Sequence, residues 1–179
     1  MKNLNVILIA ILVSFNVSAQ IKDLNLKNGL IIGQLDRSED RYSVEIALTE
    51  ILSENDIKAI PSLNILKVGA DVYHLENDSI LNIVQAKGID TYVTISVRGY
   101  DKRYKLAENH SNFKTAIRES HLFPLYKEEM LSISFEVTFY RNGEFVATDM
   151  IRCGNIDSRE DVVKQLKKKL RKRVQKKWM

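Results

Sequence analysis

The sequence predicts an α/β fold. We expect a mixed sheet of about five strands, made of a parallel β-α-β-α-β core and an antiparallel hairpin, with a C-terminal helix packed on it. Two observations carry this prediction. The first half of the chain alternates short apolar runs with segments of helical periodicity, and the second half pairs a strictly alternating strand with the turn Asn142-Gly143. The order strand–helix–strand–helix–strand implies right-handed crossovers, so its strands are expected to be parallel.

The parallel core is predicted from three apolar runs, at residues 29–36, 57–60 and 91–98. A helix is expected to begin at Ser38, whose hydroxyl would cap it. A second helix, capped by Asp78, is expected to run through Lys87 before Gly88 ends it. The apolar side chains of the first helix recur at helical spacing and predict its buried stripe: Val44, Ala47, Leu48, Ile51 and Leu52.

The second half predicts a hairpin and a final helix. Residues 130–141 alternate apolar and polar side chains, and residues 144–153 return after the turn. Counting back from a two-residue loop sets Glu136 opposite Asp149, either as two solvated carboxylates or as a paired-carboxylate site. The helix is expected over residues 158–178, capped by Ser158, with this apolar stripe: Val163, Leu166, Leu170, Val174 and Trp178.

Residues 99–128 show no clear period and exceed the usual length of a loop. They predict a long insertion in a single domain that spans residues 20–179. The insertion is either a mobile lid or a functional element, and we expect its amides to be the least protected from hydrogen exchange.

The first residues predict a secretory signal peptide over residues 1–19. A positive start precedes an apolar run from Leu4 to Val13, and small residues end at Ala19, where cleavage is expected. Gln20 stands where a lipoprotein signal requires cysteine. We therefore expect a periplasmic or secreted protein, soluble after cleavage, with neither a lipid anchor nor a transmembrane segment.

Composition excludes several kinds of site. The single cysteine, Cys153, excludes an intramolecular disulfide and any multi-thiolate metal site, and is either a small buried side chain or an exposed thiol able to dimerise. The sequence has no nucleophile elbow and no phosphate-cradling glycine loop, so we expect no cofactor and no catalytic residue. The acidic segment from Asp71 to Asp78 is either a polar capping loop or, less simply, a calcium site.

Charge divides the chain into an acidic body and a basic tail. Residues 20–163 carry 17 basic and 23 acidic residues, a net charge of −6, whereas nine bases and no acid lie from Lys164 to Lys177. The tail bases either complement the helix dipole and aid solubility, or bind an anionic envelope surface. A second candidate surface lies in the insertion, where a glycan or peptide contact fits an exported protein better than nucleic acid does. The candidate binding residues are Lys167, Lys168, Lys169, Arg171, Lys172, Arg173, Tyr100, Arg103 and Tyr104.

Several segments resemble a group of small exported bacterial proteins, many of unassigned function. Their α/β domain is similar to the anticodon-binding-like domain of the curli secretion lipoprotein, to the lipoproteins that activate peptidoglycan synthases, and to the amino-terminal domain of the Tol-Pal periplasmic protein. The likeness covers about residues 29–97 and implies a periplasmic scaffold or binding domain, because its motifs are structural. They are Ile31-Ile32-Gly33, Arg41-Tyr42-Ser43-Val44-Glu45, Ile57-Lys58-Ala59-Ile60-Pro61-Ser62 and Lys87-Gly88-Ile89-Asp90-Thr91-Tyr92-Val93, with weaker support from Tyr140-Arg141-Asn142-Gly143-Glu144.

Three classes of function follow. The leading one is a non-enzymatic exported domain that binds a protein or a component of the cell envelope. The alternative is a peripheral protein that meets the envelope surface through its basic C-terminal helix. The third is a hydrolase that uses the Asp71–Asp78 segment or the Glu136 and Asp149 carboxylates. The partner and the oligomeric state are not predicted.

Overall fold

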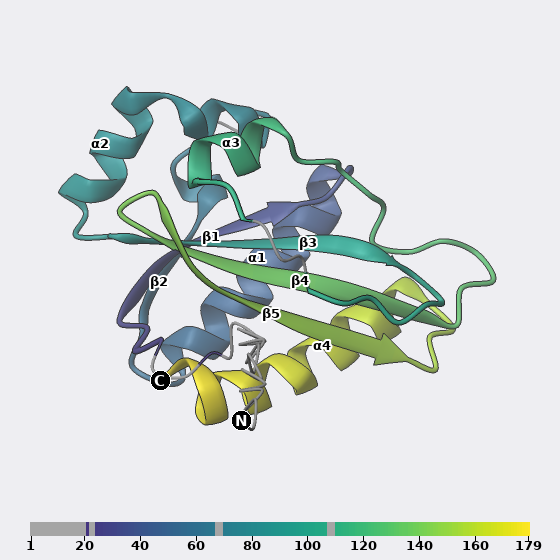
Figure 1. Ribbon diagram of the computed structural model, residues 1–179. Helices are drawn as coiled ribbons and strands as arrows, with labels where there is room; N and C mark the ends of the chain where they lie inside the picture. Colours follow the sequence, from purple (N-terminus) through teal and green to yellow (C-terminus); the bar gives the residue numbers. More distant parts are fainter. Residues whose placement is uncertain (1–20, 22–23, 67–69, 107–109) are drawn as a thin grey trace, which may run out of the picture.

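Figure 1 shows the computed structural model of the chain, which describes residues 21, 24–66, 70–106 and 110–179. The predicted signal peptide, residues 1–19, lies outside these ranges. The elements, in chain order, are β1 (Asn28–Gln34), α1 (Ser38–Ser53), β2 (Lys58–Pro61), η1 (Ser62–Asn64), η2 (Val72–Glu76), α2 (Asp78–Ala86), β3 (Thr91–Tyr100), α3 (Phe113–Arg118), β4 (Ser132–Arg141), β5 (Glu144–Gly154), α4 (Arg159–Arg173) and η3 (Val174–Trp178).

The five strands form one mixed sheet in the order β2-β1-β3-β4-β5. β1 pairs in parallel with β2 and β3, and the β3–β4 and β4–β5 pairs are antiparallel. The parallel pairs arise because α1 and then α2 carry the chain across the sheet between successive strands. The predicted fold class is therefore confirmed.

α1 and α4 pack beside each other on one face of the sheet (Figure 1). The predicted stripe of α1, from Val44 to Leu52, is buried throughout, and the stripe of α4 is buried from Leu166 to Trp178. At the start of α4, Val162 is fully buried and the predicted Val163 only partly, because the helix is rotated slightly from the predicted orientation. These two helices enclose the larger of the two hydrophobic cores.

The predicted caps of α4 and α1 have different outcomes. Ser158 caps α4 as predicted, since its hydroxyl accepts a hydrogen bond from the Asp161 amide at 3.2 Å. The predicted Ser38 cap is wrong. The Arg37 carbonyl already accepts from the Arg41 amide at 3.0 Å, so α1 begins one residue earlier and Ser38 is its first helical residue.

α2, α3 and η2 cover part of the opposite face of the sheet (Figure 1). α2 is capped by Asn77 rather than by the predicted Asp78: the Asn77 side chain accepts from the Ser79 amide at 2.9 Å. α3 lies inside the 99–128 insertion and was not predicted. With six residues and two fully buried side chains, Phe113 and Ile117, it is too short to show a period.

The β4–β5 hairpin has the predicted turn but not the predicted register. Asn142 and Gly143 have φ of 52° and 87°, as a type I′ turn requires. The pairing then shifts between Tyr140↔Phe145 and Phe139↔Ala147, which leaves one extra residue in β5. The bulge moves every later β5 side chain by one position.

A buried carboxylate joins α1 to the sheet. Glu45 is fully buried, and its Oε1 accepts hydrogen bonds from the Gly33 amide at 2.9 Å, the Arg41 guanidinium at 3.0 Å and the Ser62 hydroxyl at 2.7 Å. Its Oε2 accepts from the Leu63 amide at 3.2 Å. These groups come from three segments of the chain, namely β1, α1 and η1, so the network fixes where β1, α1 and the end of β2 meet.

Candidate functional site

A basic groove lies between β5 and the end of the C-terminal helix. Its volume is about 430 Å³, and it lies where α4 and η3 pass beneath the last half of the edge strand. Among the described residues that line it, none is acidic and six carry a positive charge. The lining residues are Met150, Ile151, Arg152, Lys169, Lys172, Arg173, Lys176 and Lys177.

Three of the six predicted helix bases are engaged in ion pairs. Lys167 lies 3.0 Å from Glu50, and Arg171 lies 2.9 Å from Glu54. The hydrogen bond from Arg171 lowers the pKa of Glu54 below its ordinary value. Glu50 lies on α1 and Glu54 is the residue that caps its C-terminal end, so these pairs join α1 to the neighbouring α4 rather than to an external partner.

Arg173 has a different role, because it neutralises a buried acid. Its guanidinium lies 3.5 Å from the Asp149 carboxylate, which also accepts a hydrogen bond from the Trp178 indole at 3.3 Å. Arg173 further donates to the Met150 carbonyl at 3.4 Å. Arg173 therefore lines the groove and anchors the end of α4 to β5.

The other three predicted bases are available to a partner. Lys168 is exposed, and Lys169 and Lys172 line the groove. Arg152 was not among the predicted binding residues, since its strand is acidic at Glu144 and Asp149 and gave no basic pattern. Arg152 lies between Ile151 and Cys153 on β5, and successive side chains of a strand point to opposite faces. The alternation of apolar and polar residues could therefore have placed Arg152 on the outer surface.

β5 is the outer strand of the sheet, and within the described part of the chain it pairs with β4 alone. It is 11 residues long. An edge strand of this length offers a row of backbone donors and acceptors to a further strand. The groove therefore combines a free sheet edge with a concentration of positive charge.

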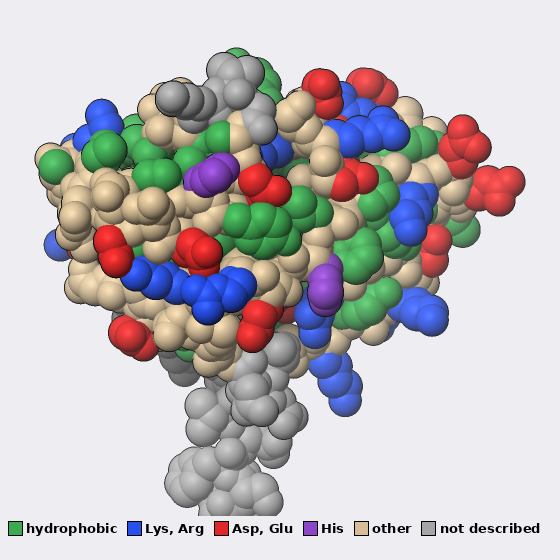
Figure 2. Space-filling model, turned by 90° about the horizontal axis from the view of Figure 1, so that it is seen from above, with side chains coloured by type: hydrophobic (Ala, Val, Ile, Leu, Met, Phe, Trp, Pro, Cys, Tyr) green, Lys and Arg blue, Asp and Glu red, His purple; other side chains and the backbone are tan. Residues whose placement is uncertain are grey.

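The described residues on the opposite side of the molecule show no such concentration of positive charge. Figure 2 views the side that carries α2 and α3, where acidic and basic side chains are interspersed. Two exposed ion pairs there link α3 to the preceding segments: Arg118 to Glu76, and Lys114 to Asp78. The basic groove is thus a local feature and not a property of the whole surface.

The predicted surface in the insertion is divided by the fold. Tyr100 is partly buried, and its hydroxyl donates to the Pro124 carbonyl while Lys127 lies 4.5 Å from its ring centre. Burial raises the pKa of Tyr100 to about 12. The Tyr104 ring packs over Gly99, and Arg103 is exposed. Only Arg103 of the three is freely presented, so the structure does not join them into one binding surface.

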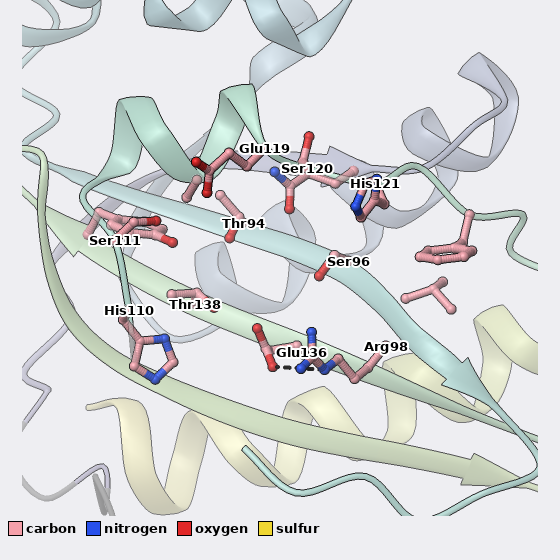
Figure 3. A pocket seen from close by; sticks show the side chains of 15 residues that line it. Thr94, Ser96, Arg98, His110, Ser111, Glu119, Ser120, His121, Glu136 and Thr138 are labelled. Atoms are coloured by element: carbon pink, nitrogen blue, oxygen red, sulfur yellow. Dashed lines mark ion pairs between the residues drawn. The ribbon is translucent and has the colours of Figure 1, made fainter. Parts of the chain in front are cut away.

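A second hollow, which the sequence did not predict, opens on the sheet face that α2 and α3 leave partly uncovered. Its volume is about 380 Å³. Figure 3 shows Thr94 and Ser96 on β3 and Glu136 and Thr138 on β4 facing the same space, with His121 at its rim. We call it the sheet pocket. The Arg98 guanidinium lies 3.7 Å from the Glu136 carboxylate in its wall.

The predicted pairing of Glu136 with Asp149 is wrong. Because of the bulge, Asp149 is opposite Val137, and Glu136 is opposite Met150. Glu136 therefore lines the sheet pocket, whereas Asp149 lies beneath Trp178 on the other face. The two carboxylates are separated by the sheet and cannot share a proton or a cation.

The Asp71–Asp78 segment is a capping loop. Asp71 accepts from the Tyr73 amide at 3.1 Å and so begins η2, and Glu76 and Asp78 form the ion pairs to α3. Among the described residues, no group of three or more His, Cys, Asp or Glu side chains could hold a metal ion. No helix among them has the length and hydropathy to cross a membrane.

Comparisons with known proteins give only distant structural likenesses. No family model matches the chain, and no curated protein matches it. Among solved structures, a PelC dodecamer from Paraburkholderia phytofirmans is 10% identical, with a TM-score of 0.43, over 88% of this chain and 92% of that one. The lipoprotein GNA1162 from Neisseria meningitidis is 10% identical, with a TM-score of 0.44, over 86% of this chain and 99% of that one. At TM-scores below 0.5 neither likeness carries an argument about function, and the resemblance to the curli and Tol-Pal proteins stays a prediction.

Proposed function

We propose that this chain is a non-enzymatic exported domain that binds an acidic, extended segment of an envelope protein in the basic groove. One observation carries the proposal: six cationic side chains line a concave surface beside the free edge of β5. Export is the expectation drawn from the signal-peptide pattern of residues 1–19.

An extended peptide fits the groove by a known physical route. A segment in β conformation can add to a free sheet edge, where main-chain hydrogen bonds give affinity and side chains give specificity. Acidic side chains of that segment would face Lys169, Lys172 and Lys176. Opposite charges also accelerate encounter, and this effect weakens as salt is added.

A protein partner fits better than an anionic membrane. The pairs from Lys167 to Glu50 and from Arg171 to Glu54 neutralise part of the helix surface that would face a bilayer. The remaining bases surround the groove. A concave surface can hold an extended peptide, whereas a flat bilayer would contact only its rim. The membrane-surface alternative therefore becomes an outcome of the test below.

The test measures affinity by fluorescence anisotropy, with a labelled peptide of alternating Glu and Val. In the groove variant, Lys169, Lys172 and Lys176 are together changed to Gln. The control changes Lys87, Lys102 and Lys105 to Gln, which removes the same charge from exposed positions outside the groove. Three charges at or near the surface, each worth about 0.2–1 kcal/mol, predict a loss of affinity of about tenfold for the groove variant.

The control should bind within about twofold of the unchanged protein, since it loses only long-range attraction. Equal loss in both variants would show that net charge alone attracts the peptide and would overturn the proposal. The proposal would also be overturned if the protein sedimented with anionic vesicles but did not bind the peptide.

A further inference from the structure

The sheet pocket holds polar groups that the protein itself does not use. Gln34, Thr94 and Tyr140 are each less than a tenth exposed, at 6%, 4% and 4%, and all three line the pocket. Between described residues, no hydrogen bond engages the side chain of any of them. Because all three residues line the hollow, a molecule bound there could exchange hydrogen bonds with their polar groups.

Glu136 adds a fourth unused group. Its Oε2 is buried without a hydrogen-bond partner among the described residues, although the Arg98 guanidinium lies 3.7 Å away. Leaving a carboxylate oxygen unsatisfied costs free energy that a well-packed apolar residue would avoid. Its position faces the interior of the pocket in Figure 3.

The register shows how the pocket arises. Thr94 pairs with Thr138, and on the next pleat Gln34 pairs with Ser96, which pairs with Glu136. On the same face, Ile32 pairs with Thr94, and the preceding row holds Leu30 and Tyr92; all three apolar side chains are buried. The face therefore changes from apolar to polar along the strands, at the point where α3 ends and the hollow begins.

We propose that the sheet pocket is a binding site for a small, neutral, polyhydroxylated molecule of the size of one sugar unit. The volume of about 380 Å³ lies at the lower end of the range of about 300–1,000 Å³ that small-molecule sites occupy. This site lies apart from the basic groove, and it does not depend on the function proposed for that groove.

The chemistry of the wall selects the ligand class. Hydroxyl groups both donate and accept, so one ligand can donate to Glu136 Oε2 and accept from Thr94, Ser96 or Arg98. Arg98 offsets the charge of Glu136, and Glu119 leaves the lining with one net negative charge, which disfavours an anionic ligand. Burial raises the pKa of Tyr140 to about 12, so its hydroxyl remains a neutral donor.

The experiment titrates the purified protein with methyl glycosides of a hexose and of an N-acetylhexosamine, followed by amide chemical shifts. The variant Thr94→Val removes one hydroxyl at nearly constant volume. The matched control is Thr49→Val, because the Thr49 hydroxyl on α1 has no hydrogen-bond partner among the described residues and lies outside the pocket. We expect shifts at β3 and β4, and about tenfold weaker binding for Thr94→Val but not for Thr49→Val.

Thermal unfolding separates a binding role from a structural one. Both valine variants remove an unused polar group, so neither should lower the unfolding temperature. Glu136→Gln keeps the shape and should also weaken binding. The proposal fails if neither glycoside shifts the β3 and β4 amides, if Thr94→Val binds as the unchanged protein does, or if free amino acids bind in preference to the glycosides.

Discussion

Individual buried polar residues fix the geometry of this domain. Glu45 illustrates this best, since one carboxylate accepts four hydrogen bonds, one each from β1 and α1 and two from η1. Gly33 permits the close approach, because a side chain there would place a Cβ 3.1 Å from Arg41 Cγ. Gly33, Arg41, Glu45 and Ser62, which are far apart in the sequence, thus meet in one network.

Removing the Glu45 carboxylate should therefore be costly. Glu45→Ala leaves Arg41 as an uncompensated buried charge, and breaking such a pair costs about 3–5 kcal/mol. Urea unfolding measures the loss. Glu39→Ala, at an exposed position on the same helix, should change stability by less than about 0.5 kcal/mol. Similar values for the two variants would show that the network contributes nothing to folding.

Cys153 is a second buried group with a measurable consequence. Its side chain is fully buried, and burial raises the pKa of the thiol to about 11. We expect alkylation at pH 8 to be slow in the native protein and fast in denaturant, because the thiolate is the reactive form. The native protein also binds the proton more tightly than the unfolded chain, so this thiol lowers stability as pH rises toward 11. Alkylation of the native protein as fast as in denaturant would contradict both the burial of the thiol and its raised pKa.

At the scale of elements, the hairpin determines which side chains share a face. The Asn142-Gly143 turn joins β4 and β5, and the bulge beyond it sends Asp149 to the helix side and Arg152 to the groove. Without the bulge, Glu136 and Asp149 would face each other, as the two-residue turn alone predicted. Because β5 holds one extra residue, Glu136 lines the sheet pocket without a second carboxylate opposite it.

Gly143→Ala tests the turn. Its φ of 87° is disfavoured for an L-residue, while a Cβ there would meet nothing within 4 Å, so the cost is conformational. We expect a loss of about 1–2 kcal/mol in unfolding free energy. Glu144→Ala, at the next and exposed position, should cost less than about 0.5 kcal/mol. An unchanged stability for Gly143→Ala would mean that the turn adopts another conformation in solution.

The elements with strong local signals were predictable, and those defined by tertiary contacts were not. The stripe of α1 and the residues of the turn appear in the sequence because their spacing and types depend only on neighbours in the chain. α3 and the bulge were missed, because a six-residue helix held by two core side chains and one inserted residue leave no periodic signature.

At the scale of the whole molecule, the sheet separates two surfaces of different character. α1 and α4 cover one face and direct the basic tail toward the outer edge, whereas α2 and α3 cover the other face only in part. The sequence predicted the basic tail, but not which bases are free. That depends on Glu50 and Glu54, which lie more than a hundred residues away in the chain and meet α4 only in the fold.

The measurement that tests the groove most directly is an amide-resolved NMR titration of the purified protein with the acidic alternating peptide. Binding as an added strand predicts saturable shifts concentrated in β5, from Glu144 to Gly154, and in α4, with little change in α2 and α3. A peptide N-methylated at every second residue keeps the charges but cannot complete the ladder of hydrogen bonds, and it should bind about tenfold more weakly. Shifts spread over the α2 and α3 side, or equal affinity of the two peptides, would contradict strand addition at the basic groove.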